Sequence, residues 1–143
     1  MDFTGASGAI PRNDYGRMDE HAALYYEQIR KRTTDITDIA KNTGFSVEDI
    51  EVIKQHIFFN EYQLDSKKVR RFDPNFDMAV SWQRLIDGKS IQDIDLVLLR
   101  HELYEYNLMR EQGLFYDEAH ILASKKYNYQ EYYDNLDRKA GLI

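Results

Sequence analysis

Apolar residues recur at steps of three and four along most of this chain, and no segment sustains the alternation of apolar and polar residues typical of a half-buried strand. The clearest example is the set of Met78, Ala79, Trp82, Leu85 and Ile86, which share one face of a helix. Two prolines and seven glycines in 143 residues leave few positions that break helices. The sequence therefore predicts an all-α fold.

The length and composition fit one domain. A chain of 143 residues with 43% hydrophobic and 31% charged residues can bury a core without disulfides or structural metals. Residues 1–17 contain three glycines and a proline and show no helical period, so we expect a flexible tail or connector there. Residues 18–143 are expected to form a single helical domain of five to seven helices.

Start and stop signals divide this domain. Helices are predicted to end at Gly44, Gly88 and Gly113, because glycine suits the left-handed turn that follows a helix. A first helix is predicted from Asp19 to Arg32, and an exposed basic loop at residues 66–71. Further starts are predicted from three capping pairs, which are Ser46 with Asp49, Asp73 with Pro74, and Ser90 with Asp93.

Two long helices are predicted on either side of Gly113. The helix before this glycine begins near Ser90, and the helix after it runs from Tyr116 or Asp117 to about Tyr127. A short turn between long helices is typical of an antiparallel αα-hairpin. A tyrosine-rich segment at residues 129–136 extends or follows the second helix.

The charge and residue types exclude several classes of protein. The chain carries 25 acidic and 19 basic residues, a formal charge of -6, which disfavours binding to nucleic acid. The absence of cysteine excludes disulfides, thiolate zinc sites and a cysteine nucleophile. No apolar run approaches the ~20 residues of a membrane span, and the first residues lack the pattern of a signal peptide. We therefore expect no membrane association and a cytoplasmic location.

Residues 36–50 resemble the helix-turn-helix of DNA-binding proteins, because Ala40, Gly44 and Ile50 have the spacing of that motif. The second helix of the motif would enter the major groove. Here it presents Ser46, Glu48, Asp49 and Glu51. Carboxylates at this place repel phosphates, so two packed helices are favoured over DNA binding.

A histidine and a glutamate interrupt the apolar face of the long helix. His101 and Glu105 are one turn apart within the stripe Ile94, Leu98, His101, Glu105, Leu108. His120 lies seven residues after Gly113, and Glu105 lies eight residues before it. In an antiparallel hairpin these two positions are at about the same height. The sequence thus predicts a cluster of His101, Glu105 and His120, with Glu102 on a neighbouring face.

This cluster has the residue types of a metal site. Two imidazoles and a carboxylate can hold a divalent metal such as zinc and leave a position open for water. His101, Glu105 and His120 are the predicted ligands, and Glu102 is the predicted general base of a metal-dependent hydrolase. His101 and Glu105 can also act as an acid–base pair without a metal. The pattern departs from the His-Glu-x-x-His signature of zinc proteases, because Glu105 stands in place of the second histidine.

A purely structural network is the alternative. Buried charges need partners, and Glu105 can orient the two histidines with help from Arg84 or a tyrosine hydroxyl. The two remaining histidines, His21 and His56, have no evident partner in the sequence and are expected to be partly exposed. The tyrosines at positions 127, 129, 132 and 133 are interpreted as a packed C-terminal cap, or as a docking face if they are exposed.

The stretch from Phe72 to Tyr129 also carries a resemblance, most clearly in His-Glu-Leu-Tyr-Glu-Tyr and Tyr-Asp-Glu-Ala-His. It resembles a helical module at the C-terminus of minor head (head-morphogenesis) proteins of phages that infect Gram-positive bacteria, and similar modules of polymorphic toxin-like proteins. The resemblance covers roughly Ile36 to Tyr129. It implies an effector delivered with a phage particle, or secreted without a signal peptide, and it assigns no functional residue.

Three functions therefore remain open. The first is a phage- or toxin-associated effector with a hydrolytic His–Glu–His site. The second is a non-enzymatic domain that binds a protein partner through its tyrosine-rich and acidic faces. The third is DNA binding through the helix-turn-helix-like pair.

Overall fold

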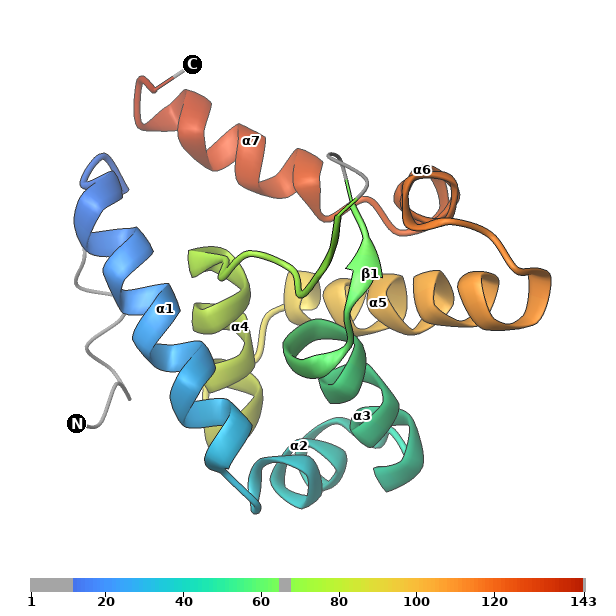
Figure 1. The fold of residues 1–143 in the computed structure, drawn as a ribbon. Helices are drawn as coiled ribbons and strands as arrows, with labels where there is room; N and C mark the ends of the chain where they lie inside the picture. Colours follow the sequence, from blue (N-terminus) through green and yellow to red (C-terminus); the bar gives the residue numbers. More distant parts are fainter. Residues whose placement is uncertain (1–11, 65–67, 143) are drawn as a thin grey trace.

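The computed structural model describes residues 12–64 and 68–142. The described residues form one helical domain with a single small hairpin of two strands (Figure 1). The all-α prediction is therefore confirmed. The elements in chain order are α1 (Tyr15–Lys31), α2 (Asp35–Thr43), α3 (Val47–Lys54), the π-helical segment η2 (Gln55–Phe59), β1 (Tyr62–Gln63), β2 (Val69–Arg70), α4 (Phe76–Asp87), α5 (Asp93–Gln112), α6 (Tyr116–Lys126) and α7 (Gln130–Lys139).

The core is built from side chains of α1, α2, α3, η2 and α5 together with those of α4. Trp82 of α4 is fully buried, and its ring packs edge-on against Phe58 at 5.2 Å between centroids. Phe58 in turn packs against Tyr26 of α1 at 4.6 Å. The apolar stripe predicted for α4 accounts for most of its buried face. The remaining core side chains are Tyr25, Ile29, Ile39, Ile50, Ile53, Ile57, Met78, Ala79, Leu85, Ile86, Leu98 and Leu99.

The ion pair of Lys54 and Asp35 is buried beside this core. The Lys54 ammonium lies 2.8 Å from Asp35 Oδ1 and also donates to the Arg32 carbonyl. The Trp82 indole donates to the other oxygen of Asp35 at 3.1 Å. These contacts join α2, α3 and α4, and they satisfy charges that would be costly to bury alone.

The predicted helix ends at Gly44, Gly88 and Gly113 are confirmed. All three glycines have positive φ, 81°, 72° and 66° respectively, which is the left-handed turn that glycine tolerates best. Ser46 caps α3 by accepting a hydrogen bond from the Asp49 amide at 3.0 Å, as its position predicts. Glu48 is exposed on α3, so a DNA phosphate at this helix would be repelled by a negative charge.

Two predicted helix starts are wrong. The cap of α4 is Asn75, which accepts from the Met78 amide at 2.9 Å, rather than Asp73 with Pro74. The cap of α5 is Gln92, paired with Asp95 in a reciprocal capping box, rather than Ser90. In both cases the helix begins two residues later than predicted.

The first helix begins earlier than predicted. It starts at Tyr15 instead of Asp19, because Asp14 caps it by accepting from the Arg17 amide at 3.1 Å. Arg12 pairs with Asp77 at 2.7 Å and with Asp137 at 2.8 Å, so the end of the predicted tail contacts α4 and α7. Residues 1–11 of that tail lie outside the described residues.

The hairpin of β1 and β2 was missed in the sequence. The two strands pair antiparallel with Tyr62 opposite Arg70, and two residues per strand are too few to show alternation. Of the predicted basic loop at residues 66–71, residues 66 and 67 lie outside the described residues, and residues 69 and 70 form β2 instead of a loop. The hairpin places Tyr62 and Phe72 against His56, with ring centroids 5.2 and 5.3 Å away. Among the described helices, none is both long and apolar enough to cross a membrane.

Candidate metal site

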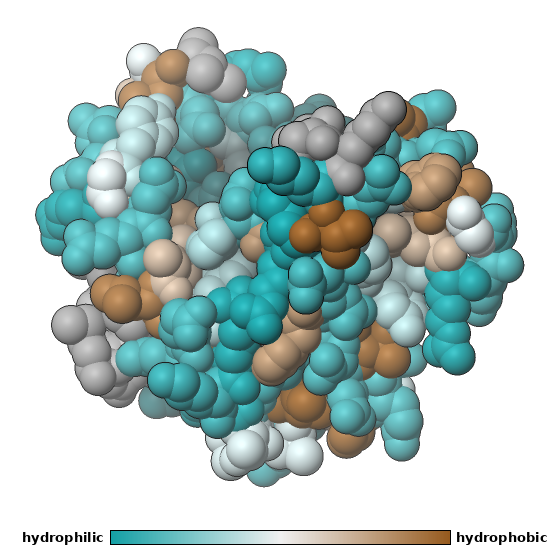
Figure 2. Space-filling model, viewed as in Figure 1, coloured by the Kyte–Doolittle hydropathy of each residue, from teal (hydrophilic) through white to brown (hydrophobic). Residues whose placement is uncertain are grey.

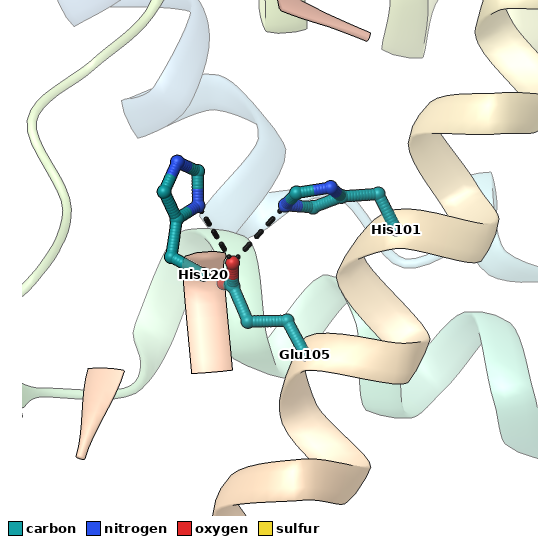
Figure 3. Close-up of side chains that lie close together, drawn as sticks. All are labelled: His101, Glu105 and His120. Atoms are coloured by element: carbon teal, nitrogen blue, oxygen red, sulfur yellow. Dashed lines mark hydrogen bonds and ion pairs between the residues drawn. The ribbon is translucent and has the colours of Figure 1, made fainter. Parts of the chain in front are cut away.

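The long helix α5 carries the first half of the site. Its buried face contains the predicted stripe, and both His101 and Glu105 are almost completely buried, at 0% and 1% exposure. They lie one turn apart, so the His101 Nε2 atom reaches Glu105 Oε2 at 3.1 Å (Figure 3). Glu102, on the neighbouring face, is also buried.

The second half comes from α6 through the turn at Gly113. His120 Nδ1 lies 2.9 Å from Glu105 Oε2, so the same carboxylate oxygen contacts both histidines (Figure 3). The side chain of His120 is 38% exposed, unlike that of His101. The structure thus brings together the three residues that the hairpin register predicts to meet.

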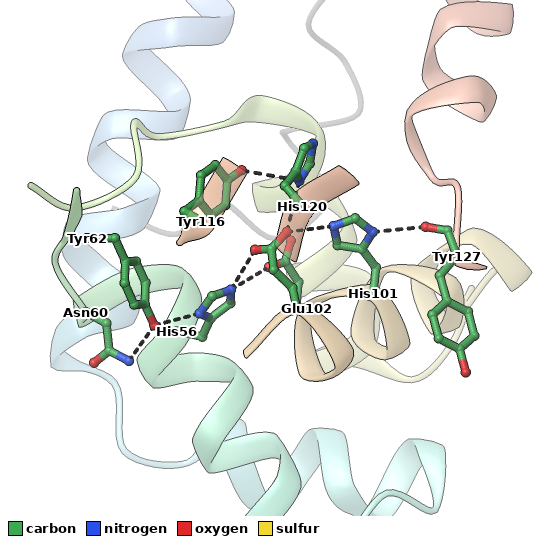
Figure 4. A network of polar contacts seen from close by, with 9 residues as sticks. His56, Asn60, Tyr62, His101, Glu102, Tyr116, His120 and Tyr127 are labelled. Carbon is green, nitrogen blue, oxygen red and sulfur yellow. Dashed lines mark hydrogen bonds and ion pairs between the residues drawn. The ribbon is translucent and has the colours of Figure 1, made fainter. Parts of the chain in front are cut away.

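A third histidine completes the cluster, contrary to prediction. His56 was expected to be partly exposed, yet it is fully buried, with its Nε2 atom 2.8 Å from Glu105 Oε1 and 3.3 Å from Glu102 Oε2 (Figure 4). His56 lies three residues after Ile53 and next to Ile57, so it belongs to the same buried face as the predicted stripe, and η2 turns residues 56–58 into the core. His21 is likewise buried, packed on Tyr25 and Phe76.

Backbone and phenol groups fix the orientation of two imidazoles. His101 Nδ1 donates to the Tyr127 carbonyl at 2.9 Å, which leaves Nε2 facing Glu105. His56 Nδ1 lies 2.7 Å from the Tyr62 hydroxyl, and Asn60 donates to that hydroxyl at 3.0 Å. Partners of this kind commonly set the tautomer of metal-binding histidines.

The predicted helper Arg84 is not part of the cluster. Its guanidinium pairs with Asp95 near the start of α5, at 2.9 Å from Nε and 2.6 Å from a terminal nitrogen. The tyrosine hydroxyls that do contact the site are those of Tyr62 and of Tyr116, the latter 3.3 Å from His120 Nδ1. Arg84 turns away because Asp95 is buried and needs a cation.

The electrostatics of the cluster favour charged side chains. Burial alone lowers the pKa of His56, but hydrogen bonds to Glu102 and Glu105 outweigh it, so the pKa lies well above 6.5. Burial also lowers the pKa of His101, and Glu105 and Glu102 likewise raise it overall. Burial raises the pKa of Glu105, but the hydrogen bonds from three histidines lower it below 4.5. In the absence of a metal, the cluster is therefore a buried ion-pair network.

The cluster opens onto a cavity of about 240 Å³. Glu102 and Glu105 lie in its wall, together with Tyr26, Tyr116 and Tyr129. The carboxylates therefore face a space large enough for water and a small ligand, rather than solid packing.

Two sets of side chains have the composition and closeness of metal ligands. In each set, the ligand atoms lie within 4.8 Å of one another. The first set is His101, Glu105 and His120, and the second is His56, Glu102 and Glu105.

Comparison of the chain with protein-family models, curated proteins and solved structures finds no match. The functional argument therefore depends on the geometry of this site. Among the residues predicted from the sequence, His101 and His120 contact Glu105, and Glu105 and Glu102 line the cavity. The catalytic and metal-binding roles of these four residues stay predictions.

Proposed function

We propose that this protein is a metal-dependent hydrolase that holds a divalent ion, such as zinc, between α5 and α6. The single observation that carries the proposal is the convergence of His101 Nε2 and His120 Nδ1 on Glu105 Oε2, the oxygen of a carboxylate that itself lines a cavity. Two imidazoles and one carboxylate form the usual protein ligand set of a catalytic zinc ion, which keeps a fourth position for water.

The surroundings of these ligands support the same chemistry. The Tyr127 carbonyl holds His101 with its Nε2 atom toward the ligand position, as second partners of metal-bound histidines do. His120 is the most exposed of the three ligands and lies where substrate can approach. Glu102 is buried beside the cavity and serves as the general base that takes a proton from the metal-bound water.

The proposed biological role is that of an effector module associated with phage particles or toxins. This role derives from the resemblance of residues 36–129 to the modules of minor head and toxin-like proteins. A hydrolytic site suits an effector that acts inside a target cell, while fold alone does not specify function.

Metal analysis tests the proposal. Protein purified without an affinity tag should contain at least about one equivalent of a divalent metal per chain, and less than about a tenth of an equivalent after metal supplementation would refute it. His120→Ala should lose the ion held by His101, Glu105 and His120 while staying folded, because His120 is partly exposed. Glu118→Gln, on the exposed face of the same helix, is the matched control.

Expression in a bacterium tests the effector role. Growth arrest by the wild-type protein, abolished by His120→Ala but not by Glu118→Gln, is the expected result. Growth arrest that persists in a folded His120→Ala variant that has lost this ion would exclude the hydrolytic site as its cause.

A second candidate is a domain that binds a protein partner. The observation in its favour is a set of large apolar side chains exposed on and next to α6, namely Phe115 at 66%, Ile121 at 56% and Leu122 at 41%. The predicted tyrosine face is weaker, because Tyr133 is buried, whereas Tyr132 is 38% exposed. On the face drawn in Figure 2, hydrophobic residues are scattered among hydrophilic ones.

This candidate makes a different prediction from the hydrolase. Harmless expression together with co-purification of one defined partner is expected, and Ile121→Asp should abolish the association without changing metal content. An association that survives Ile121→Asp would exclude α6 as the binding surface.

A further inference from the structure

The second set of ligand-type side chains lies directly beside the first. His56 Nε2, Glu102 Oε2 and Glu105 Oε1 converge within 4.8 Å of one another, and all three residues are buried (Figure 4). They come from η2 and from the same turn of α5 that supplies the first set. The proposed hydrolytic function uses only one of these two sets as metal ligands.

Glu105 belongs to both sets, and its two oxygens are divided between them. Oε1 faces His56 at 2.8 Å, whereas Oε2 faces His101 at 3.1 Å and His120 at 2.9 Å. A carboxylate that offers one oxygen to each side is the geometry of a bridging ligand between two metal ions. Ions in such paired sites are about 3.5–4 Å apart.

The distances within the second set suit a metal ion as well as a shared proton. Tetrahedral zinc with bonds of about 2.0–2.1 Å to nitrogen and oxygen separates its ligand atoms by about 3.3 Å. His56 Nε2 is 3.3 Å from Glu102 Oε2 and 2.8 Å from Glu105 Oε1. Exchange of the proton for an ion therefore needs only a small outward shift of side chains at the edge of a cavity.

The partners of His56 prepare it for this role. The Tyr62 hydroxyl takes the Nδ1 side of the ring, just as the Tyr127 carbonyl does for His101. Asn60 donates to Tyr62 and holds the phenol in place. Both histidines thus present their Nε2 atoms to Glu105, each with its other nitrogen already occupied.

We propose that the site binds two divalent metal ions bridged by Glu105, one held with His101 and His120 and the other with His56 and Glu102. The proposal rests on the hydrolase function above and refines it. Glu102 then becomes a ligand of the second ion, and the attacking hydroxide is held between the two ions.

The paired centre also specifies a class of substrate. One divalent ion neutralises the two carboxylates, whereas two ions leave the centre cationic. A cationic pair attracts an anion and stabilises the added negative charge of phosphoryl displacement, so the substrate class is a phosphate ester. In that reaction the hydroxide oxygen bonds to phosphorus, the ester P–O bond breaks, and the leaving alkoxide takes a proton from water.

Counting bound ions tests the paired site. Metal-free, untagged protein titrated with zinc and weighed by native mass spectrometry should bind two ions. Glu102→Gln, which keeps the size of the side chain, and His120→Ala should each bind one, and circular dichroism should confirm that both variants are folded.

The outcomes separate the two proposals. One ion bound by the wild-type protein would overturn the paired site and leave the single-metal hydrolase standing. No bound ion would overturn both, and two ions in a folded Glu102→Gln variant would overturn the assignment of Glu102 as a ligand.

Inorganic phosphate tests the substrate class. The two-zinc protein should bind phosphate at least about tenfold more tightly than Glu102→Gln carrying one zinc, because the variant lacks the attraction of one divalent ion for the anion. Equal phosphate affinity in the two proteins would overturn the phosphate-ester assignment.

Discussion

Replacing Glu105 by glutamine tests the central electrostatic argument. The carboxylate is 1% exposed and lies 2.8 Å from His56, 3.1 Å from His101 and 2.9 Å from His120. Glutamine keeps the shape but removes the charge, so buried His101 loses the carboxylate it contacts and buried His56 keeps only Glu102, at 3.3 Å. Breaking a buried ion pair in this way costs about 3 kcal/mol or more of unfolding free energy. At roughly 2–4 °C per kcal/mol for a chain of this size, the melting temperature should fall by ~10 °C.

The assay is thermal unfolding of metal-free protein followed by circular dichroism. Glu111→Gln, exposed near the end of the same helix, is the matched control and should change the unfolding free energy by no more than about 0.5 kcal/mol. A Glu105→Gln protein that melts within about 2 °C of the wild type would refute the claim that this carboxylate holds the network together.

Four further outcomes are expected. Burial lowers the pKa values of His56 and His101, but Glu102 and Glu105 raise them overall. The stability that the protonated histidines give the folded protein is therefore complete below about pH 6.5, and it is lost as the pH rises through the raised pKa values. Urea melts of metal-free protein should therefore show lower stability at about pH 9 than at about pH 6. Lys54→Met, which strips buried Asp35 of its cation, should cost about 3 kcal/mol in urea unfolding. Gly88→Ala should lower the melting temperature, because φ is 72° and a Cβ would lie 2.7 Å from the side chain of Asn42; the strain is about 1–3 kcal/mol. Zinc at about a hundredfold excess over its Kd should stabilise the wild type by about 2.7 kcal/mol in calorimetry, and an unchanged melting temperature would contradict metal binding.

Much of the site was predictable because it depends on local periodicity. His101 and Glu105 are one turn apart on an apolar face, so any regular helix buries them together. Gly113 ends that helix and sets the register of the hairpin, which brings His120 to Glu105. The helix ends at Gly44 and Gly88 were also predictable from the local sequence, because the left-handed turn after a helix favours glycine.

The choice among neighbouring polar residues was less predictable. Asn75 rather than Asp73 caps α4, and Arg84 binds Asp95 rather than the histidine cluster. In each case several partners lie within reach along the sequence. Arg84 pairs with Asp95 because Asp95 is fully buried and needs a cation, and this burial is known only once the helices have packed. Asn75 and Asp73 are both exposed, so burial does not explain the choice of cap for α4.

The sequence by itself determined the all-α class, the main helix ends and the trio of His101, Glu105 and His120, because these follow from short-range steric rules and helical period. Only the tertiary structure decided that His56 joins them, and that Glu105 contacts His56 with one oxygen and the other two histidines with the other. His56 of η2 contacts Glu105, which lies 49 residues later in the chain, and the small hairpin places the Tyr62 hydroxyl at the other ring nitrogen of His56. Such contacts arise from packing between distant segments, which no local pattern encodes.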